Sequence, residues 1–463
     1  MTTTPTLSTP ARRRGLRPLL LRLHFYAGVF VGPFILIATF TGLLYAVIPQ
    51  LDDAVYRHEL TVDHVGEQRL SLAEQIRAVR AAHPEGTVES IRPPAAADET
   101  TRITLAVDDV PPDYARTVFV DPYTGEVRGA LTTYGQWMPL RAWFDELHRN
   151  LHLDAVGRNY SELAASWLWV IALAGLTLWY LHRRDTKKLN RIAVPDRDKK
   201  DRRRTLSWHG AVGVWIIVAL LGLSVTGITW SRYGGETVNL LQERLNTAAP
   251  SVDTTLIPSR NDTSGGHQHG GPSALGGDAS LHGADTALHA AREAGLSGPM
   301  WMYPPAGHDQ GWEIAENKRD WPTRYDAVSV HPDSGAITDR VNQADWPFLA
   351  KLTNWAIDAH MGVLFGIANQ IALAITAIGL ITVVVRGYRM WWQRRPTRGS
   401  AWAVGRPPLR GTFRGLHPAA ITLLVTVALT LGWALPLFGL SLAAFVVVDL
   451  LIGAVKKRKG IDV

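Results

Sequence analysis

The apolar residues of this chain gather in long runs that polar regions separate. Runs over residues 25–48, 163–181, 210–230 and 361–385 each reach the length of about 20 residues with which a helix crosses a bilayer. A fifth run, residues 419–455, is too long for one span and is interrupted by Gly432, Pro436 and Gly439, so it predicts a hairpin of two short spans. The pattern predicts a mainly α-helical membrane protein, with a bundle of about six transmembrane helices: four in a core and two in the C-terminal hairpin.

Two polar regions, residues 50–162 and 231–359, lie between these runs. Each contains a stretch with the spacing of an amphipathic helix, followed by runs with the alternation of β-strands. The helical stretches are residues 71–82 and 284–294, and the strand-like runs are residues 102–107, 116–120 and 312–316. We therefore expect two small α+β domains, each with one helix packed on an antiparallel sheet.

One turn motif occurs in both polar regions. The sequences are Asp121-Pro-Tyr-Thr-Gly125 and His331-Pro-Asp-Ser-Gly335, and strand-like residues flank both. The proline opens the turn and the glycine supplies its left-handed residue, so each motif predicts a β-hairpin.

A segment rich in Gly and Ser, residues 261–277, precedes the second helical stretch and contains His267 and His269. Its composition predicts a flexible loop. Two interpretations of the histidine pair stay open: solvated side chains, or a weak site for copper or zinc.

The basic residues are concentrated at the ends of the apolar runs. Residues 1–24, 182–208, 386–415 and 456–463 carry 28 of the 48 Lys and Arg residues. Because Lys and Arg are enriched in cytoplasmic loops, we expect both termini to be cytoplasmic and the two polar regions to be extracytoplasmic. The formal net charge of +7 then reflects topology, and no nucleic-acid partner is expected. No clear cleavage site follows the first apolar run, so we expect it to remain as a signal anchor.

The chain contains no cysteine. This composition excludes disulfide bonds, cysteine-ligated iron–sulfur clusters and covalent attachment of haem through a Cys-x-x-Cys-His motif. Any haem in this protein must therefore be bound without a covalent link, as haem b.

Two histidines occupy equivalent places at the starts of the first and third apolar runs. His24-x3-Gly28, followed by Thr41-Gly42, is repeated as His209-x3-Gly213, followed by Thr226-Gly227. Because His24 and His209 share a predicted depth, we expect their imidazoles to bind the two faces of one haem. Each glycine at i+4 lies on the histidine's helix face and leaves room for a flat macrocycle, and Arg22 is a candidate partner for a propionate. We interpret the Thr-Gly pairs as helix-packing positions.

A second pair of histidines lies near the opposite border of the membrane. Trp143-x4-His148 is repeated as Trp355-x4-His360, each just ahead of an apolar run. We expect His148 and His360 to bind a second haem. His152, four residues after His148, would lie on the same helix face and is an alternative ligand. The competing interpretation is that all these histidines merely occupy the hydrated headgroup region, but their duplication favours haem ligation.

These motifs together resemble the PepSY-associated transmembrane-helix family of bacterial inner-membrane proteins, over about residues 15–395. The resemblance is carried by Leu23-His24 with Thr41-Gly42-Leu43, Leu147-His148-Arg149-Asn150-Leu151, Trp208-His209 with Thr226-Gly227, and Ala359-His360-Met361-Gly362. The two hairpin motifs resemble those of PepSY domains, although His331 occupies the place that Asp121 has in the first hairpin.

The resemblance implies a multi-pass protein of the bacterial plasma membrane with a role in iron uptake. Some members are haem-containing reductases of ferric siderophores, so it implies His24, His209, His148 and His360 as ligands of two haem b groups. It further implies a ferric siderophore or other Fe(III) chelate as electron acceptor, and a quinol or cytoplasmic reductase as donor. The alternative is a membrane-anchored PepSY protein that binds or assembles a partner without haem and is not an enzyme.

Overall fold

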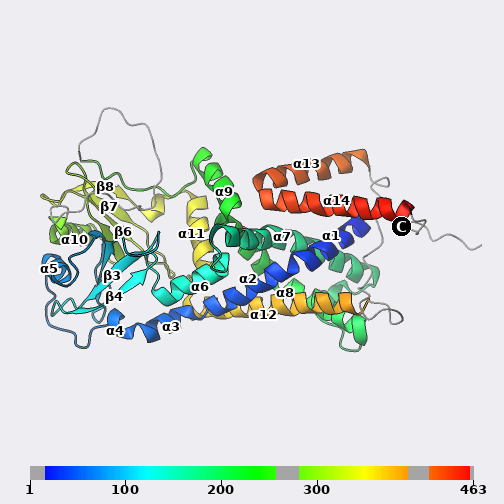
Figure 1. The fold of residues 1–463 in the computed structure, drawn as a ribbon, viewed down its shortest axis with the longest axis horizontal. Helices are drawn as coiled ribbons and strands as arrows, with labels where there is room; N and C mark the ends of the chain where they lie inside the picture. The colour runs from blue at the N-terminus through cyan, green and yellow to red at the C-terminus, as the bar shows by residue number, and fades with distance from the viewer. Residues whose placement is uncertain (1–15, 257–280, 395–416, 459–463) are drawn as a thin grey trace, which may run out of the picture. The chain divides into compact units, whose positions relative to one another are not determined.

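The computed structural model describes residues 16–256, 281–394 and 417–458 (Figure 1). The chain divides into two compact units. The membrane unit comprises Met1–Leu43, His148–Leu241 and Leu373–Val463, and the sheet unit comprises Leu44–Leu147 and Gln242–Ala372. The predicted loop with His267 and His269 lies outside the described residues.

The membrane unit is built of apolar helices. They are α1 (Leu16–Phe30), α2 (Gly32–Tyr45), α7 (Asp154–Asp185), α8 (Asp201–Thr229), α12 (Gly366–Trp392), α13 (Pro418–Ala434) and α14 (Pro436–Arg458), with α9 (Arg232–Arg244) and the short η1 (Leu189–Arg191). Among the described residues, α7, α8, α12 and α14 are long and apolar enough to cross a membrane, and α1 with α2 is a fifth candidate if the bent pair is one span. The apolar helix α13 has 17 residues. The protein is therefore a mainly helical, multi-pass membrane protein, and six spans remain a prediction.

The first apolar run is bent, although its sequence suggested an unbroken span. Helices α1 and α2 meet at 57°. Pro33 has no amide hydrogen to donate to the Val29 carbonyl, and its ring disfavours a straight helix. The Tyr388 hydroxyl of α12 donates to that carbonyl instead, at 2.8 Å. A Cβ atom on Gly32 would lie 3.0 Å from the same hydroxyl oxygen, so a side chain there would crowd this contact.

Helix α7 packs against α1, α8 and α14 in the core of the membrane unit. Its residue Trp167 is fully buried, with its ring centroid 4.7 Å from that of Phe438. The indole nitrogen donates a hydrogen bond of 2.8 Å to the Ser441 hydroxyl of α14. Through this ring contact and this hydrogen bond, Trp167 joins the C-terminal hairpin to the other helices.

The sheet unit contains one antiparallel sheet of eight strands, in the order β4-β3-β2-β1-β5-β6-β7-β8. The strands are β1 (Thr87–Arg92), β2 (Thr101–Ala106), β3 (Ala115–Val120), β4 (Val127–Thr133), β5 (Met300–Tyr303), β6 (Trp312–Glu316), β7 (Ala327–Val330) and β8 (Ile337–Val341). The sequence suggested two separate domains. The structure joins the two halves where β1 pairs with β5, with Ile91 opposite Met302. Pairing β1 with β5 covers an edge that each half would otherwise expose.

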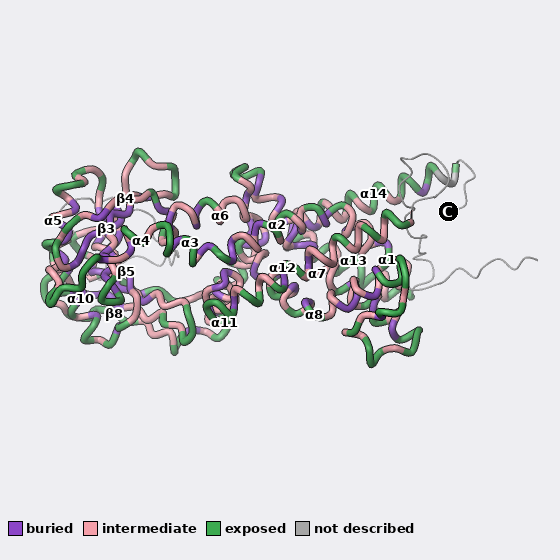
Figure 2. The backbone as a smooth tube through the Cα atoms, turned by 90° about the horizontal axis from the view of Figure 1, so that it is seen from below, coloured by how far each residue is buried: buried purple, intermediate pink, exposed green. Residues whose placement is uncertain are grey.

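Two helices, α5 (Leu72–Ala82) and α10 (Ala284–Glu293), cover one face of this sheet (Figure 1). Alternate strand residues from both halves, such as Ile103 and Ile314, join them in a single apolar core. Figure 2 shows buried stretches of backbone in the region of β3 and β4. The predicted pattern of one helix per half is therefore present, but the two halves share one core.

Side chains from both halves of the sheet unit accept hydrogen bonds from the first amides of helix α5. Ser71 and Glu74 form a capping box, in which each side chain bonds to the other residue's backbone amide. The Asp285 carboxylate of α10 accepts from the amides of Leu72 and Ala73, at 2.6 and 3.1 Å. The remaining helices of the sheet unit are α3 (Ile48–Val55), α4 (Arg57–Leu60), α6 (Pro139–Asn150), α11 (Phe348–His360) and the short η3 (Gln343–Asp345).

Candidate functional site

A cavity of about 390 Å³ lies among α1, α2, α7, α8 and α12 of the membrane unit. Its lining is mostly apolar and includes His24 and His209, so we call it the histidine cavity. Its volume is within the range of about 300–1,000 Å³ that is usual for pockets that bind small molecules and cofactors.

The structure brings His24 of α1 and His209 of α8 together. Their ring centroids are 6.2 Å apart and their planes are inclined at 81°. The Nδ1 atom of His24 is 3.0 Å from the Ile171 carbonyl, and that of His209 is 2.9 Å from the Val383 carbonyl. A carbonyl oxygen only accepts hydrogen bonds, so Nδ1 carries the proton in both rings. In a neutral imidazole this leaves Nε2 with a free lone pair, the form that binds a metal.

The separation of the two rings suits a shared metal ion. A metal–imidazole bond is about 2.0 Å long and the ring centre lies about 1 Å beyond the nitrogen, so two imidazoles on opposite sides of one metal have centroids roughly 6 Å apart. The observed 6.2 Å agrees with that distance. The donor set, two imidazoles in an apolar cavity with no thiolate, fits a non-covalently bound haem.

Glycines keep the space beside the two histidines open. Gly28 and Gly213 line the cavity as predicted, and a Cβ atom on either would meet no atom within 4 Å. The structure adds Gly175 of α7, where a Cβ would lie 2.8 Å from Cε1 of His24. Sequence reasoning missed Gly175 because it does not belong to the repeat. Any side chain there would displace the imidazole.

The charged residues at the cavity differ from the prediction. Arg22 does not line it, because its guanidinium pairs with the Asp449 carboxylate of α14 and bonds to the Tyr26 hydroxyl. The arginines that line the cavity are Arg17, Arg202 and Arg394. They are candidates for binding the propionates of a haem.

His148, at the end of α6, occupies a site made by the first Thr-Gly pair. Its Nδ1 is 2.9 Å from the Thr41 hydroxyl oxygen, which itself donates to main-chain carbonyls of α2. This contact orients the imidazole toward α2. A Cβ atom on Gly42 would lie 3.1 Å from Cε1 of His148. Burial lowers the pKa of His148 to about 4, so the ring is neutral at neutral pH.

The prediction that His152 shares a helix face with His148 is wrong. Helix α6 ends at Asn150, and Leu151 and His152 have φ values of 58° and 55°, in the left-handed region. The His152 side chain is exposed, and its backbone amide donates to the Asn150 side chain at 2.8 Å. The helical spacing fails here because the chain turns between the two histidines.

His360 is the last residue of α11, in the sheet unit. The same helix carries Asp358, whose buried carboxylate accepts hydrogen bonds from Arg319 at 2.6 Å and from Tyr325 at 2.5 Å. Burial raises the pKa of Asp358 and the nearby Arg319 lowers it. These contacts fix the last turn of α11. His148 belongs to the membrane unit, so the pairing of His148 with His360 remains a prediction.

The described residues contain no cluster of three or more His, Cys, Asp or Glu side chains able to hold a metal ion. The family model of the PepSY-associated transmembrane region matches residues 21–394 of the chain. The chain belongs to the PepSY-associated transmembrane family. No curated protein matches it.

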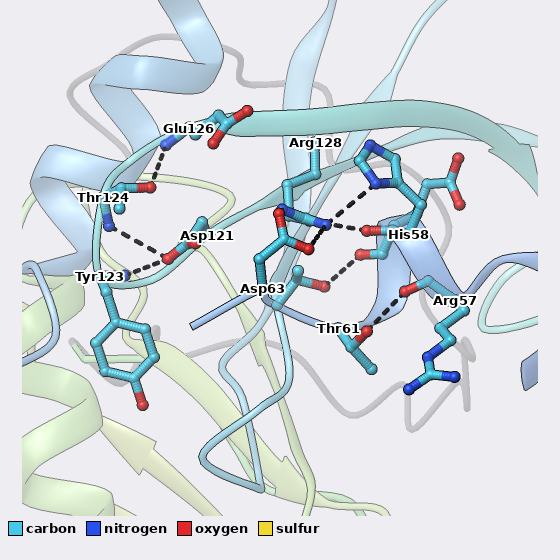
Figure 3. A network of polar contacts seen from close by, with 11 residues as sticks. Arg57, His58, Thr61, Asp63, Asp121, Tyr123, Thr124, Glu126 and Arg128 are labelled. Carbon is cyan, nitrogen blue, oxygen red and sulfur yellow. Dashed lines mark hydrogen bonds and ion pairs between the residues drawn. The ribbon is translucent and has the colours of Figure 1, made fainter. Parts of the chain in front are cut away.

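The hairpin turns of this PepSY-associated protein explain the departure at His331. In the first turn, the Asp121 carboxylate accepts from the amides of Tyr123 and Thr124, at 2.8 and 3.2 Å (Figure 3). In the second, Nδ1 of His331 accepts from the amides two and three residues on, at 3.2 and 3.4 Å. Imidazole thus replaces carboxylate as the acceptor in the same turn. The histidine has a structural role there.

The second Thr-Gly pair lies between packed helices. Gly227 of α8 faces α7, where an added Cβ would be 3.1 Å from Cβ of Ala165. The Thr226 hydroxyl donates to the Gly222 carbonyl one turn earlier, at 2.9 Å. Helix packing therefore explains Gly227, whereas Gly42 of the first Thr-Gly pair contacts His148. Sequence repetition located both pairs without indicating that the first one holds an imidazole.

Proposed function

We propose that this protein is a haem b electron-transfer protein that carries electrons from the cytoplasmic side of a bacterial plasma membrane to an acceptor outside. The observation that carries the proposal is the pair of imidazoles in the histidine cavity, with centroids 6.2 Å apart and both Nδ1 atoms bonded to main-chain carbonyls. Two imidazole ligands leave no open position on a haem iron, which suits electron transfer rather than oxygen chemistry.

His24 and His209 would hold the first haem through Nε2. When bound, haem supplies a one-electron Fe(III)/Fe(II) couple, whose potential depends on ligands, hydrogen bonds and burial. The chain's own residues position the group. The carbonyls of Ile171 and Val383 orient the rings and increase their basicity. Gly28 and Gly213 leave room for the macrocycle, and the arginines at the cavity are placed to neutralise propionates.

A second haem, bound by His148 and His360, would complete a path toward the outer side. The Thr41 hydroxyl supports this role for His148, because its contact with Nδ1 orients the imidazole. For the acceptor we propose a ferric siderophore or another Fe(III) chelate. Adding one electron gives Fe(II), which such chelates hold less tightly, so iron is released. A quinol or a cytoplasmic reductase would supply the electrons.

The first test is a reduced-minus-oxidised absorption spectrum with haem quantification on the purified full chain, expressed with ample haem. We expect the sharp bands of low-spin haem b and about two haems per chain. Reduction of an Fe(III) chelate by the pre-reduced protein is measured next. A colourless protein would contradict the haem proposal and leave a non-enzymatic role in binding or assembly.

The assignment of the first site is tested with His209→Ala. We expect this variant to lose about one haem of two and to keep its fold, because it removes one ligand of one site. The matched control is His417→Ala, since His417 bonds to the Ala419 amide at the start of α13 and does not line the cavity. Full haem content in the His209 variant would contradict the assignment.

A further inference from the structure

A second cavity, of about 470 Å³, lies where the N-terminal turns of α8 meet the last turns of α12 in the membrane unit. Its lining includes Lys200, Arg204, Arg386 and Arg389, together with Asp201 and Trp208. We call it the basic pocket. It adjoins the polar ends of two helices that are long and apolar enough to span a membrane, so we expect it at the level of lipid headgroups.

The basic side chains of the basic pocket outnumber its acidic ones. Four basic side chains face one carboxylate, and none of the four forms an ion pair within the described part of the chain. Arg183, from the same basic region of the sequence, shows the contrast: it is buried with Asp196 at 2.9 Å. Like charges gathered in one pocket repel one another, so a bound anion would stabilise this arrangement.

One side chain of the pocket has an unmet hydrogen-bonding group. The Nε atom of Arg386 is buried and has no hydrogen-bond partner among the described residues. The guanidinium lies over the Trp208 ring, with its central carbon 5.4 Å from the ring centroid. Buried donors are normally satisfied, so Arg386 is poised for an acceptor that the protein does not itself supply.

We propose that the basic pocket binds the phosphate group of an anionic phospholipid. Arginine is suited to phosphate because its planar group donates paired hydrogen bonds. Helix α8, which is 29 residues long, begins at the same place, and the side chain of its N-cap residue Lys200 does not cap it. Trp208 is a residue type typical of the membrane interface, where it would contact the lipid below its headgroup. Basic pockets between helices at this level suit acidic headgroups, which favours a lipid over a soluble phosphate.

The pocket shares its helices with His209 but does not depend on haem. Trp208 precedes His209 on α8, and Arg386 follows Val383, whose carbonyl bonds to His209, on α12. A lipid in the pocket would therefore contact the two helices that hold this imidazole. Lipid binding and haem content are measured separately, so failure of either proposal is distinguishable from failure of the other.

The test uses the full chain, purified in a neutral detergent and stripped of lipid. Phosphatidylglycerol and phosphatidylcholine are titrated in turn, and bound lipid is counted by native mass spectrometry. We expect phosphatidylglycerol to bind about tenfold more tightly. The double variant Arg386→Gln/Arg389→Gln should lose that preference. The control Arg197→Gln/Arg203→Gln removes the same charge from residues that do not line the pocket, and should keep it.

Three results would overturn the proposal. Equal affinity for the two lipids would show that headgroup charge is not recognised, and this measurement needs no variant to fold. Full competition by inorganic phosphate at the same concentration as the lipid would indicate a site for free phosphate. An equal loss in the control variant would indicate a general effect of positive charge on the surface.

Discussion

Two main-chain carbonyls determine the chemistry available to His24 and His209. Ile171 and Val383 each accept a hydrogen bond from Nδ1, so both rings present Nε2. The contact uses the backbone carbonyls of Ile171 and Val383, and every residue type has such a carbonyl, so no side-chain motif marks these positions. A histidine that looks ordinary in the sequence is thereby prepared as a ligand.

Replacing Gly213 tests whether the open space in the histidine cavity is used by a ligand. Gly213→Leu should abolish binding of the haem at His24 and His209, because its side chain would fill space that is otherwise empty, and the fold should be retained. The matched control is Gly222→Leu on the same helix, where a Cβ also meets no atom within 4 Å and which does not line the cavity. Haem content per chain is the measurement. Equal haem content in both variants would contradict the prediction.

The side chains of Asp121 and His331, which accept hydrogen bonds in the two hairpin turns, should contribute unequally to the stability of the sheet unit. Asp121→Ala should lower the free energy of unfolding of the sheet unit by about 1–2 kcal/mol, because it leaves two amides without a charged acceptor. His331→Ala should cost less, since its two hydrogen bonds are longer and its ring is neutral when it accepts. Chemical denaturation of both variants measures the difference. A larger loss at His331 would contradict this account.

At the scale of elements, the bend between α1 and α2 and the cap of α5 both depend on a distant partner. Pro33 frees the Val29 carbonyl, and Tyr388 of α12 satisfies it. The first amides of α5 are satisfied by Asp285 of α10. In both cases a local sequence feature leaves a polar backbone group open, and tertiary packing supplies the partner.

Asp285→Ala should therefore destabilise a helix to which residue 285 does not belong. We expect a loss of about 1 kcal/mol in the stability of the sheet unit, and faster amide exchange at the start of α5. The control is Glu293→Ala at the end of α10, whose exposed contact with His289 should contribute less than about 0.5 kcal/mol. Unchanged exchange at Leu72 and Ala73 would contradict the role of Asp285.

At the scale of the whole molecule, the two units have separate apolar cores. One core lies between the sheet and its two helices, and the other lies among the membrane helices. The histidine cavity belongs to the membrane unit, and the hairpin turns belong to the sheet unit. Mutations in the two cores therefore act on different sets of contacts.

We expect Gly213→Leu and Asp285→Ala to act independently. The first should change haem content without changing sheet-unit stability, and the second should do the reverse. In the double variant the stability changes should add within about 0.5 kcal/mol, as for distant sites that share no partner. Hydrogen exchange and haem quantification on all three variants measure this, and a coupling well above that value would contradict it.

The sequence by itself determined the membrane class, most of the apolar helices, the family and the repeated positions of His24, His209, Gly28 and Gly213. These features are local or repeated, so spacing and composition reveal them. Only the tertiary structure decided that the two halves share one sheet, that Arg22 pairs with Asp449 and that Ile171 and Val383 orient the imidazoles. Each of these contacts joins residues far apart in the chain, and packing, which no local pattern records, brings them together.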